Sequence, residues 1–421
     1  MPGLQPLRTP RPVARNGVPG AARFSVGLAP ALVTAVAYVD PGNVATNVSA
    51  GAGYGYRLLW VVVGSNAAAG LIQYLSAKLG ACSGRSLTEH VAGALGPRGR
   101  LAYWLQAELM AAATDIAEVV GGALALRMLF GLPLWLGAVL TAVGSTGLLL
   151  LRDVRGQRAF ALAVTVVLVL VGGAFVGCAL AARPAAGATA AGLVPSLPSG
   201  AMLLASGIFG ATVMPHAVYV HSALSRDGLA VPPGQRRAPV RALLSATRAG
   251  VVVAMTGAGT VNAALLLIAA ALLPAQGGVM DLVQAHTMIS ALLGAGPALA
   301  LALALLLSGL ASTSVGTHAG DLAMRELLHR RVPLWLRRLP GPVPALVLLA
   351  AGADPTRLLV LSQVALSVCV PFVLVPLVAF TARGTVLGAA VNHRVTTVLA
   401  SLVAAAAMAV DIVLLTQAVS G

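Results

Sequence analysis

Long runs of hydrophobic residues follow one another along most of the chain, with short polar segments between them. A helix needs roughly 17 to 25 mostly apolar residues to cross a bilayer. Runs suited to this lie at 25–49, 58–78, 101–126, 133–151, 159–182, 201–224, 249–273, 288–310, 341–353, 358–380 and 395–418. The pattern therefore predicts an all-α polytopic membrane protein with eleven transmembrane helices, of which the ninth is the shortest and contains prolines.

The basic residues alternate between the two sides of these predicted helices. If the N-terminus is placed in the cytoplasm, 23 of the 27 Lys and Arg residues fall in cytoplasmic segments. The outside segments hold only Arg57, Arg127, Arg183 and Arg357. Basic residues are enriched in cytoplasmic loops, so we predict a cytoplasmic N-terminus and an outside C-terminus. Residues 1–24 are basic and rich in proline, which predicts a disordered cytoplasmic tail and not a secretory signal.

The composition agrees with a membrane protein and argues against a soluble one. The chain is 58% hydrophobic and 9% charged, far below the roughly 25% charged residues of globular proteins. The net charge of +15 does not indicate nucleic-acid binding, because aromatics are only 4% and the basic residues lie between apolar runs. The lipid bilayer is the expected partner. The three cysteines form no C-x-x-C pair and predict no disulfide framework.

Two of the apolar runs are interrupted by residues that break helices. The first contains Asp40-Pro41-Gly42, and the sixth, "GATVMPHAVYVH", contains Pro215. Because these runs are five apart, they are the first helices of two five-helix halves, 25–182 and 201–380, with 395–418 as an extra helix. Five is odd, so the halves are inverted relative to each other. Paired broken helices in an inverted repeat predict a substrate site near the membrane midplane, with helices 1 and 6 unwound there.

The residues at the two breaks suit a metal cation. A carboxylate inside the membrane is costly unless it is paired, so Asp40 is expected to meet a cation. Asn43 adds a carboxamide oxygen, the backbone before Pro215 offers the carbonyl of Ala211, and Met214 offers a thioether sulfur. Mg²⁺ and Ca²⁺ prefer shells made only of oxygen. A soft sulfur ligand favours Mn²⁺, Fe²⁺, Co²⁺ or Cd²⁺.

The chain resembles the Nramp family of proton-coupled divalent metal transporters. The resemblance rests on "DPGN", "ATVMPH" and "AELMAAATDIAEVVGGA", and runs from about residue 25 to residue 418. It implies a leucine-transporter-like fold, alternating access and uptake of Mn²⁺ or Fe²⁺ into the cytoplasm. It also implies that Asp40, Asn43, Ala211 and Met214 bind the metal, joined by Gln363 in one conformational state. Ala217 departs from an Asn that is frequent in the family.

Three of the twelve acidic residues lie in the third run, at Glu108, Asp115 and Glu118. At about 100° per residue, the second and third fall within roughly 80° of the first. They form one acidic stripe, which indicates either structural ion pairs or a proton relay. The resemblance favours the relay, with His216 in gating or proton coupling, and we expect proton symport. Asp40 is expected to bind both metal and proton.

Other classes of function were weighed against metal transport. A sodium- or proton-coupled symporter of a small organic solute would suit the broken helices, but Asp40 would repel a substrate carboxylate. A Mg²⁺ transporter is disfavoured by Met214. A membrane metalloenzyme or an ATPase would need H-E-x-x-H or a G-x-x-x-x-G-K-[ST] loop, and neither is present. We therefore expect no enzyme activity and no cofactor.

Three further expectations concern the setting of the protein. The use of Arg over Lys favours a bacterial origin, and hence a plasma-membrane location. We expect the protein to function as a monomer. Asp411, in the last apolar run, has no role that the sequence explains.

Overall fold

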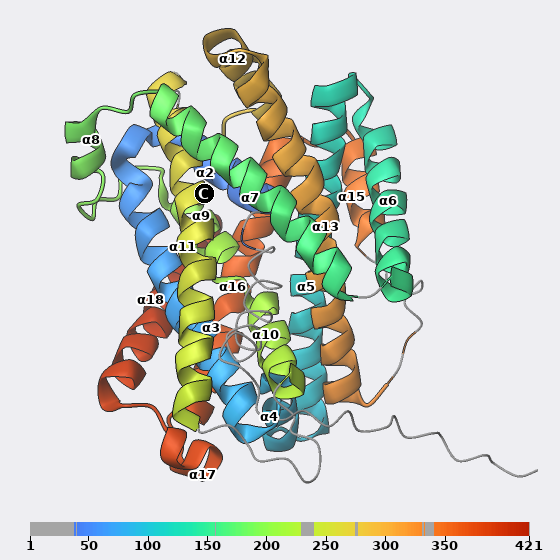
Figure 1. The fold of residues 1–421 in the computed structure, drawn as a ribbon, viewed down its shortest axis with the longest axis vertical. Helices are drawn as coiled ribbons and strands as arrows, with labels where there is room; N and C mark the ends of the chain where they lie inside the picture. Colours follow the sequence, from blue (N-terminus) through green and yellow to red (C-terminus); the bar gives the residue numbers. More distant parts are fainter. Residues whose placement is uncertain are drawn as a thin grey trace, which may run out of the picture.

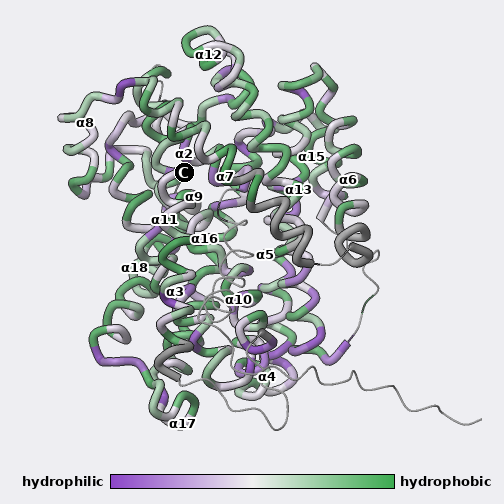
Figure 2. The backbone as a smooth tube through the Cα atoms, viewed as in Figure 1, coloured by the Kyte–Doolittle hydropathy of each residue, from purple (hydrophilic) through white to green (hydrophobic). Residues whose placement is uncertain are grey.

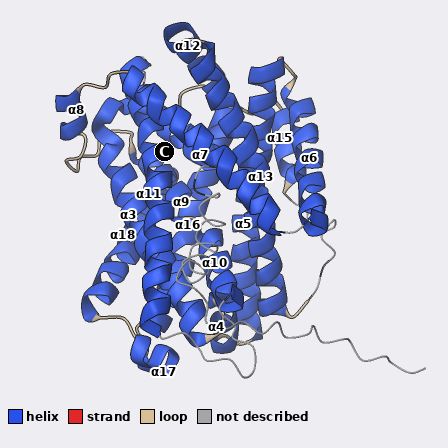
Figure 3. Cartoon of the chain, viewed as in Figure 1, coloured by secondary structure: helices blue, strands red, loops and turns tan. Residues whose placement is uncertain are grey.

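The computed structural model describes residue 38 and residues 40–155, 157–228, 240–273, 277–330, 332 and 341–420. The predicted tail 1–24 and most of the first half of the run 25–49 lie outside these residues. In the part of the chain that is described, all regular secondary structure is helical (Figure 3). The predicted all-α class is therefore confirmed.

Each predicted apolar run that falls in the described residues corresponds to one or two helices. The longer helices are α2 (Pro41–Tyr54), α3 (Leu59–Ser83), α5 (Pro97–Phe130), α6 (Leu134–Arg155), α7 (Gln157–Ala181), α9 (Met202–Val213), α10 (Pro215–Gly228), α11 (Val240–Leu272), α12 (Leu282–Leu293), α13 (Ala295–Leu328), α16 (Pro355–Thr381) and α18 (Arg394–Ser420). The shorter ones are η2 (Gly55–Leu58), α4 (Leu87–Ala94), α8 (Ala186–Ala191), α15 (Pro342–Ala350), α17 (Gly384–Leu387) and η3 (Gly388–Ala390).

Within the described residues, seven helical stretches are long and apolar enough to cross a membrane. One of them, Pro41–Ser83, contains the end of the predicted run 25–49 and the whole of the run 58–78, and three shorter apolar helices accompany the seven. The count of eleven stays a prediction. The predicted run 288–310 differs from the structure, because the chain turns at Gly294, which has φ of 92°. Residues before this glycine belong to α12, and those after it begin the much longer α13.

The helices form one bundle with α12 at one end and α4 at the other (Figure 1). Hydrophilic residues gather around α4, whereas most of the chain between the two ends is hydrophobic (Figure 2). The broken sixth run lies deepest: 89% of the apolar stretch in Met202–Asp227 is buried, against 22% in Arg394–Gln417. This places α9 and α10 in the centre and α18 at the lipid-facing edge.

Close backbone contacts hold the central helices together. A Cβ atom added at Gly121 of α5 would lie only 2.2 Å from Cβ of Pro41, so this proline packs directly on the α5 backbone. A Cβ atom at Gly210 of α9 would lie 2.2 Å from the carbonyl oxygen of Gln363 in α16. These glycines let α2, α5, α9 and α16 approach closely where the two helix breaks occur.

Candidate metal site at the two helix breaks

The first break is a capped helix start in the interior of the protein. Asp40 is the N-cap of α2, with extended backbone (φ −83°, ψ 167°), and its Oδ1 accepts a hydrogen bond from the backbone N–H of Asn43 at 2.7 Å. Pro41 occupies the first helical turn, where its missing N–H costs nothing. The sequence Asp-Pro-Gly-Asn therefore starts a helix inside the hydrophobic run, at the predicted break.

The second break lies between α9 and α10. α9 ends at Val213, and Met214 adopts φ of 42° before Pro215 begins α10. Left-handed backbone is uncommon for a residue with a side chain and often marks a functional position. In a continuous helix the N–H of residue 215 would donate to the carbonyl of Ala211, but proline has no N–H. The break thus frees the Ala211 carbonyl.

The side chain of Asn43 joins the two breaks. Its Nδ2 donates to Asp40 Oδ1 at 2.9 Å and to the carbonyl oxygen of Ala211 at 3.0 Å. Asp40 is 2% exposed, and Asn43 and Ala211 are completely buried. The structure therefore brings three of the predicted metal-binding residues into direct contact inside the protein, although Asn43 and Ala211 are 168 residues apart.

The electrostatics of this point favour positive charge. The last carbonyls of α9 form the negative end of that helix, and the Asp40 carboxylate stands beside them. The start of α2 contributes N–H groups, one of which is already bonded to Asp40. The N–H groups of the Asn43 amide provide the partial positive charge between the two oxygens. A cation is the natural competitor for these oxygens.

The other two predicted ligands lie next to this contact. Met214 is fully buried at the break itself, three residues after Ala211. Gln363 is also fully buried, and a Cβ atom at Gly42 would lie 1.9 Å from its Nε2, so its side chain rests on the Asp-Pro-Gly turn. Gln363 Oε1 is buried and has no hydrogen-bond partner among the described residues. A buried acceptor without a partner, on a side chain that touches the helix break, is available to a ligand.

The structure adds a residue that the sequence reasoning missed. Asn262 of α11 is 1% exposed, and its Nδ2 lies 3.4 Å from Asn43 Oδ1 and 3.4 Å from the carbonyl of Tyr38. It supports the carboxamide that joins the two breaks. The signal was present in the sequence, because Asn262 is the only carboxamide in the apolar run 249–273.

Three of the predicted proton-pathway residues, Glu108, Asp115 and Glu118, lie on α5, as the stripe requires. Glu118 is 1% exposed, and its Oε1 accepts a hydrogen bond from Ser312 of α13 at 2.7 Å. Asp115 is half-buried against Gly341, and Glu108 is half-buried further toward the start of the helix. His216 faces the same helix, because its Nδ1 lies 3.4 Å from Thr114 Oγ1. Thr114 was not predicted.

At the α4 end of the bundle, an ion-pair network joins three helices. Arg226 at the end of α10 contacts Glu89 of α4 at 2.9 Å and Glu326 of α13 at 2.9 Å. Ser86 donates to Glu326 as well, and it caps α4 together with Glu89. A carboxylate near the end of a transmembrane helix is usually exposed to solvent, but the side chain of Glu326 is only 11% exposed. This network closes one end of the bundle.

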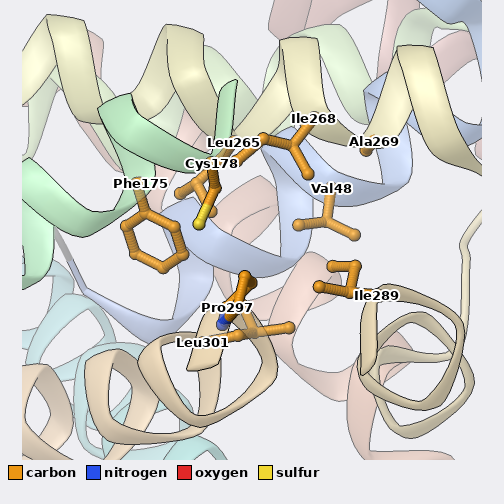
Figure 4. A pocket seen from close by; sticks show the side chains of 9 residues that line it. All are labelled: Val48, Phe175, Cys178, Leu265, Ile268, Ala269, Ile289, Pro297 and Leu301. Atoms are coloured by element: carbon orange, nitrogen blue, oxygen red, sulfur yellow. The ribbon is translucent and has the colours of Figure 1, made fainter. Parts of the chain in front are cut away.

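An apolar cavity lies among α2, α7, α11, α12 and α13 (Figure 4). Val48, Ile268 and Leu301 are among its lining side chains, and the sulfur of Cys178 is its one polar side-chain atom. It offers no oxygen ligand from a side chain, so it is not a second metal site. Across the described ranges, no three His, Cys, Asp or Glu residues come together either.

Comparison with known proteins agrees with this geometry. Residues 31–417 match the family described as natural resistance-associated macrophage protein-like, or Nramp. The chain is 48% identical to the divalent metal cation transporter MntH of Mycobacterium tuberculosis, over 94% of this chain and 92% of that protein. It is 43% identical to the MntH of Deinococcus radiodurans, over 96% and 93% of the two chains.

Solved structures show the same relationship at the level of the fold. A manganese transporter of Eremococcus coleocola superposes with a TM-score of 0.80 at 29% identity, covering 95% of this chain and 88% of that one. The nucleobase-cation-symport-1 transporter Mhp1 superposes with a TM-score of 0.59 at 17% identity, which shows a shared fold alone. The leucine-transporter-like fold class is therefore confirmed. From the match over residues 31–417 and the identity to both transporters, the chain belongs to the Nramp family.

Proposed function

We propose that this protein imports divalent transition-metal ions, Mn²⁺ and Fe²⁺ first among them, and also Co²⁺ and Cd²⁺. The observation that carries the proposal is the hydrogen bond between Asn43 and the Ala211 carbonyl. It joins the two broken helices at a buried point where a carboxylate, a carboxamide and a freed carbonyl meet. The family membership and the names of the relatives support the same conclusion.

The ion would take the place of the Asn43 N–H groups between Asp40 and the Ala211 carbonyl. Asn43 would then turn its amide so that Oδ1, not Nδ2, faces the ion. Met214 would supply the sulfur that distinguishes Mn²⁺ and Fe²⁺ from Mg²⁺ and Ca²⁺. Gln363, whose side chain lies against Gly42 and whose Oε1 has no partner among the described residues, would add a further oxygen when α16 moves.

Proton symport is part of the proposal. A metal ion needs the Asp40 carboxylate in its ionised form, so a proton held there must leave when the ion binds. His216 faces α5 through Thr114, and α5 carries Glu108, Asp115 and Glu118. These residues give the proton a route that is separate from the metal site.

We further propose alternating access between the two ends of the bundle. The Arg226 network holds α10 against α4 and α13, so it must open when the ion leaves toward that end. That end is assigned to the cytoplasm of a bacterial cell by the basic residues around it, with the C-terminus outside. One chain supplies both helix breaks, so we propose that the monomer is the functional unit, a transporter without enzyme activity.

Purified protein in liposomes tests the proposal. Mn²⁺ uptake and acidification of the lumen are followed together, with metal outside and a pH dye inside. We expect the wild-type protein to import Mn²⁺ with protons, and Asp40→Asn to lose both activities. Asp281→Asn is the matched control, since it also replaces an N-cap Asp by Asn, which caps equally well, but at an exposed position far from the two breaks. A wild-type protein that moves no divalent ion would contradict the proposal.

A further inference from the structure

Asp411 is a buried carboxyl that neither the metal site nor the acidic stripe accounts for. It is the only acidic residue of α18, which is otherwise largely exposed to lipid. Its side chain turns inward, so that Asp411 is only 7% exposed. Its Oδ1 accepts a hydrogen bond from Ser367 Oγ of α16 at 3.2 Å.

Among the described residues, no cation on the helices packed against α18 reaches Asp411. α18 packs against α16, α9 and α3. α9 contains no titratable residue, and those of α3, Tyr74, Lys78 and Cys82, lie in its last ten residues. Lys78 contacts Asn392 at 2.8 Å, just before α18 begins, and Asp411 lies about 25 Å further along that helix.

The remaining titratable groups are on α16 and on α18 itself. Arg357 of α16 precedes Ser367 by ten residues, about 15 Å along the helix. Arg394 is the first residue of α18, as distant as Lys78. Cys369 lies close enough to sense the charge of Asp411, but a thiol offers no positive charge. An ionised carboxylate with such neighbours is costly in a membrane, so this arrangement favours the neutral form of Asp411.

The turn of α16 that contacts Asp411 is a weak point of that helix. Pro371 lies inside α16 and lacks the N–H that would bond to the Ser367 carbonyl four residues earlier. A helix with this defect bends more readily there. A change in the Ser367–Asp411 contact therefore acts on a part of α16 that can move.

The same turn rests on the candidate metal site. A Cβ atom at Gly210 would lie 2.6 Å from the backbone nitrogen of Ser367 and 2.2 Å from the carbonyl oxygen of Gln363. Gly210 directly precedes Ala211, whose carbonyl bonds to Asn43. The turn 363–367 is thus held between α18 on one side and the end of α9 on the other.

We propose that Asp411 is a further proton-binding residue of the transport cycle, which positions α16 through Ser367. With a proton bound, Asp411 keeps α16 against α18, as in the structure. When α16 moves and water reaches the carboxyl, the proton leaves and the return of α16 requires it again. The inference rests on the proposed proton-coupled metal transport, and adds to it a site on α18, outside the acidic stripe of α5.

The pH profile of Mn²⁺ uptake into liposomes tests this role. Asp411→Asn keeps a neutral group that can bond to Ser367 but cannot titrate. We expect this variant to fold and to bind Mn²⁺ normally. The ratio of its uptake rate at about pH 5.5 to its rate at about pH 7.5 should differ from the wild-type ratio at least about threefold. Asp411→Glu, which still titrates, should restore the wild-type profile. Asp354→Asn, an exposed N-cap change on α16, should leave it unaltered.

Three results would overturn the inference. A wild-type pH profile in Asp411→Asn would show that the proton on Asp411 takes no part in the cycle. Equal changes in Asp411→Asn and Asp411→Glu would show a packing role only. A wild-type protein that moves no Mn²⁺ would instead remove the proposed function, and with it the basis of this inference.

Discussion

Met214 is fully buried and has φ of 42°, between a helix that ends and a proline that begins the next one. A buried methionine elsewhere in this protein fills space, as Met110 of α5 does. Met214 lies instead three residues from the carbonyl that the break releases. Its backbone conformation is one that a side chain normally disfavours. The residue thus combines a special backbone position with the only soft ligand in the proposed set.

The first prediction concerns metal selectivity. Met214→Ala removes the thioether and leaves oxygen ligands, which suit Ca²⁺ and Mg²⁺ as well as Mn²⁺. We expect the concentration of Ca²⁺ that halves Mn²⁺ uptake to fall by about tenfold or more, equivalent to roughly 1.4 kcal/mol of discrimination. Met110→Ala removes an equally buried methionine and is expected to leave competition unchanged. Equal Ca²⁺ competition in Met214→Ala and wild type would exclude the sulfur as the selective group.

The second prediction concerns the support of Asn43. Asn262→Ala removes the side chain that lies 3.4 Å from Asn43 Oδ1 and leaves the proposed ligands in place. Loss of such a supporting group typically weakens metal binding by about 10- to 100-fold. Isothermal titration with Mn²⁺ measures the effect. Asn66→Ala is the control, because Asn66 also bonds to α11, at the Met255 carbonyl, away from the site. If Asn262→Ala and Asn66→Ala bind Mn²⁺ equally well, Asn262 does not support the metal site.

At the level of the helices, the two breaks were the most predictable features. Asp40-Pro41 is a local signal for a helix start, and Pro215 is a local signal for a helix end, so both could be found without tertiary information. The boundary between α12 and α13 was missed because Gly294 lies inside a continuous hydrophobic run. Hydropathy indicates which residues avoid water, but it does not show where the backbone changes direction.

The third prediction concerns the network that closes the α4 end. Arg226→Gln breaks the ion pairs that tie α10 to α4 and α13, so the open state should become more populated. In a cysteine-free background, Ala223→Cys places a reporter at a fully buried position of α10. We expect its labelling from the cytoplasmic side to become about three- to tenfold faster, in line with two modest ion pairs.

The control for this experiment is Arg325→Gln. Arg325 pairs with Asp321 on the same helix, α13, and so joins no two elements. Its loss should leave the labelling rate of Ala223→Cys unchanged. If Arg226→Gln also leaves the rate unchanged, the network does not restrain α10.

At the scale of the whole molecule, the charge pattern predicts which end of the bundle faces the cytoplasm. The Arg226 network and the hydrophilic residues around α4 gather at one end, and α12 lies at the other (Figures 1 and 2). Arg98 and Arg357 are exposed near the starts of α5 and α16 and are assigned to opposite sides. They are suited to a test of orientation, because both are arginines near the first turn of a helix.

The fourth prediction follows from this assignment. In a cysteine-free background, an impermeant thiol reagent added to intact cells should label Arg357→Cys and not Arg98→Cys. In inside-out vesicles the labelling should be reversed. The reverse pattern in intact cells would invert the proposed orientation and the direction of import with it.

The assembly of the site was predictable only in part from the sequence. Asp40, Asn43, Ala211 and Met214 could be chosen because each lies at a helix break and has suitable chemistry. Their convergence depends on a contact between residues 168 apart, which no local pattern encodes. Gln363 came from family resemblance alone, since its position over Gly42 results from the packing of α16. The contacts of Asn262 and Thr114 could not be predicted, because they depend on how α11 and α5 pack beside the breaks.

The central claim is that both helix breaks hold one metal ion together. Anomalous diffraction from crystals soaked in Mn²⁺ tests it directly, because the signal locates the metal without assumptions about its ligands. We predict one strong peak within coordination distance of the Asp40 carboxylate, the Ala211 carbonyl and the Met214 sulfur. A strong peak beside Glu118 and Asp115, with none between α2 and α9, would contradict it.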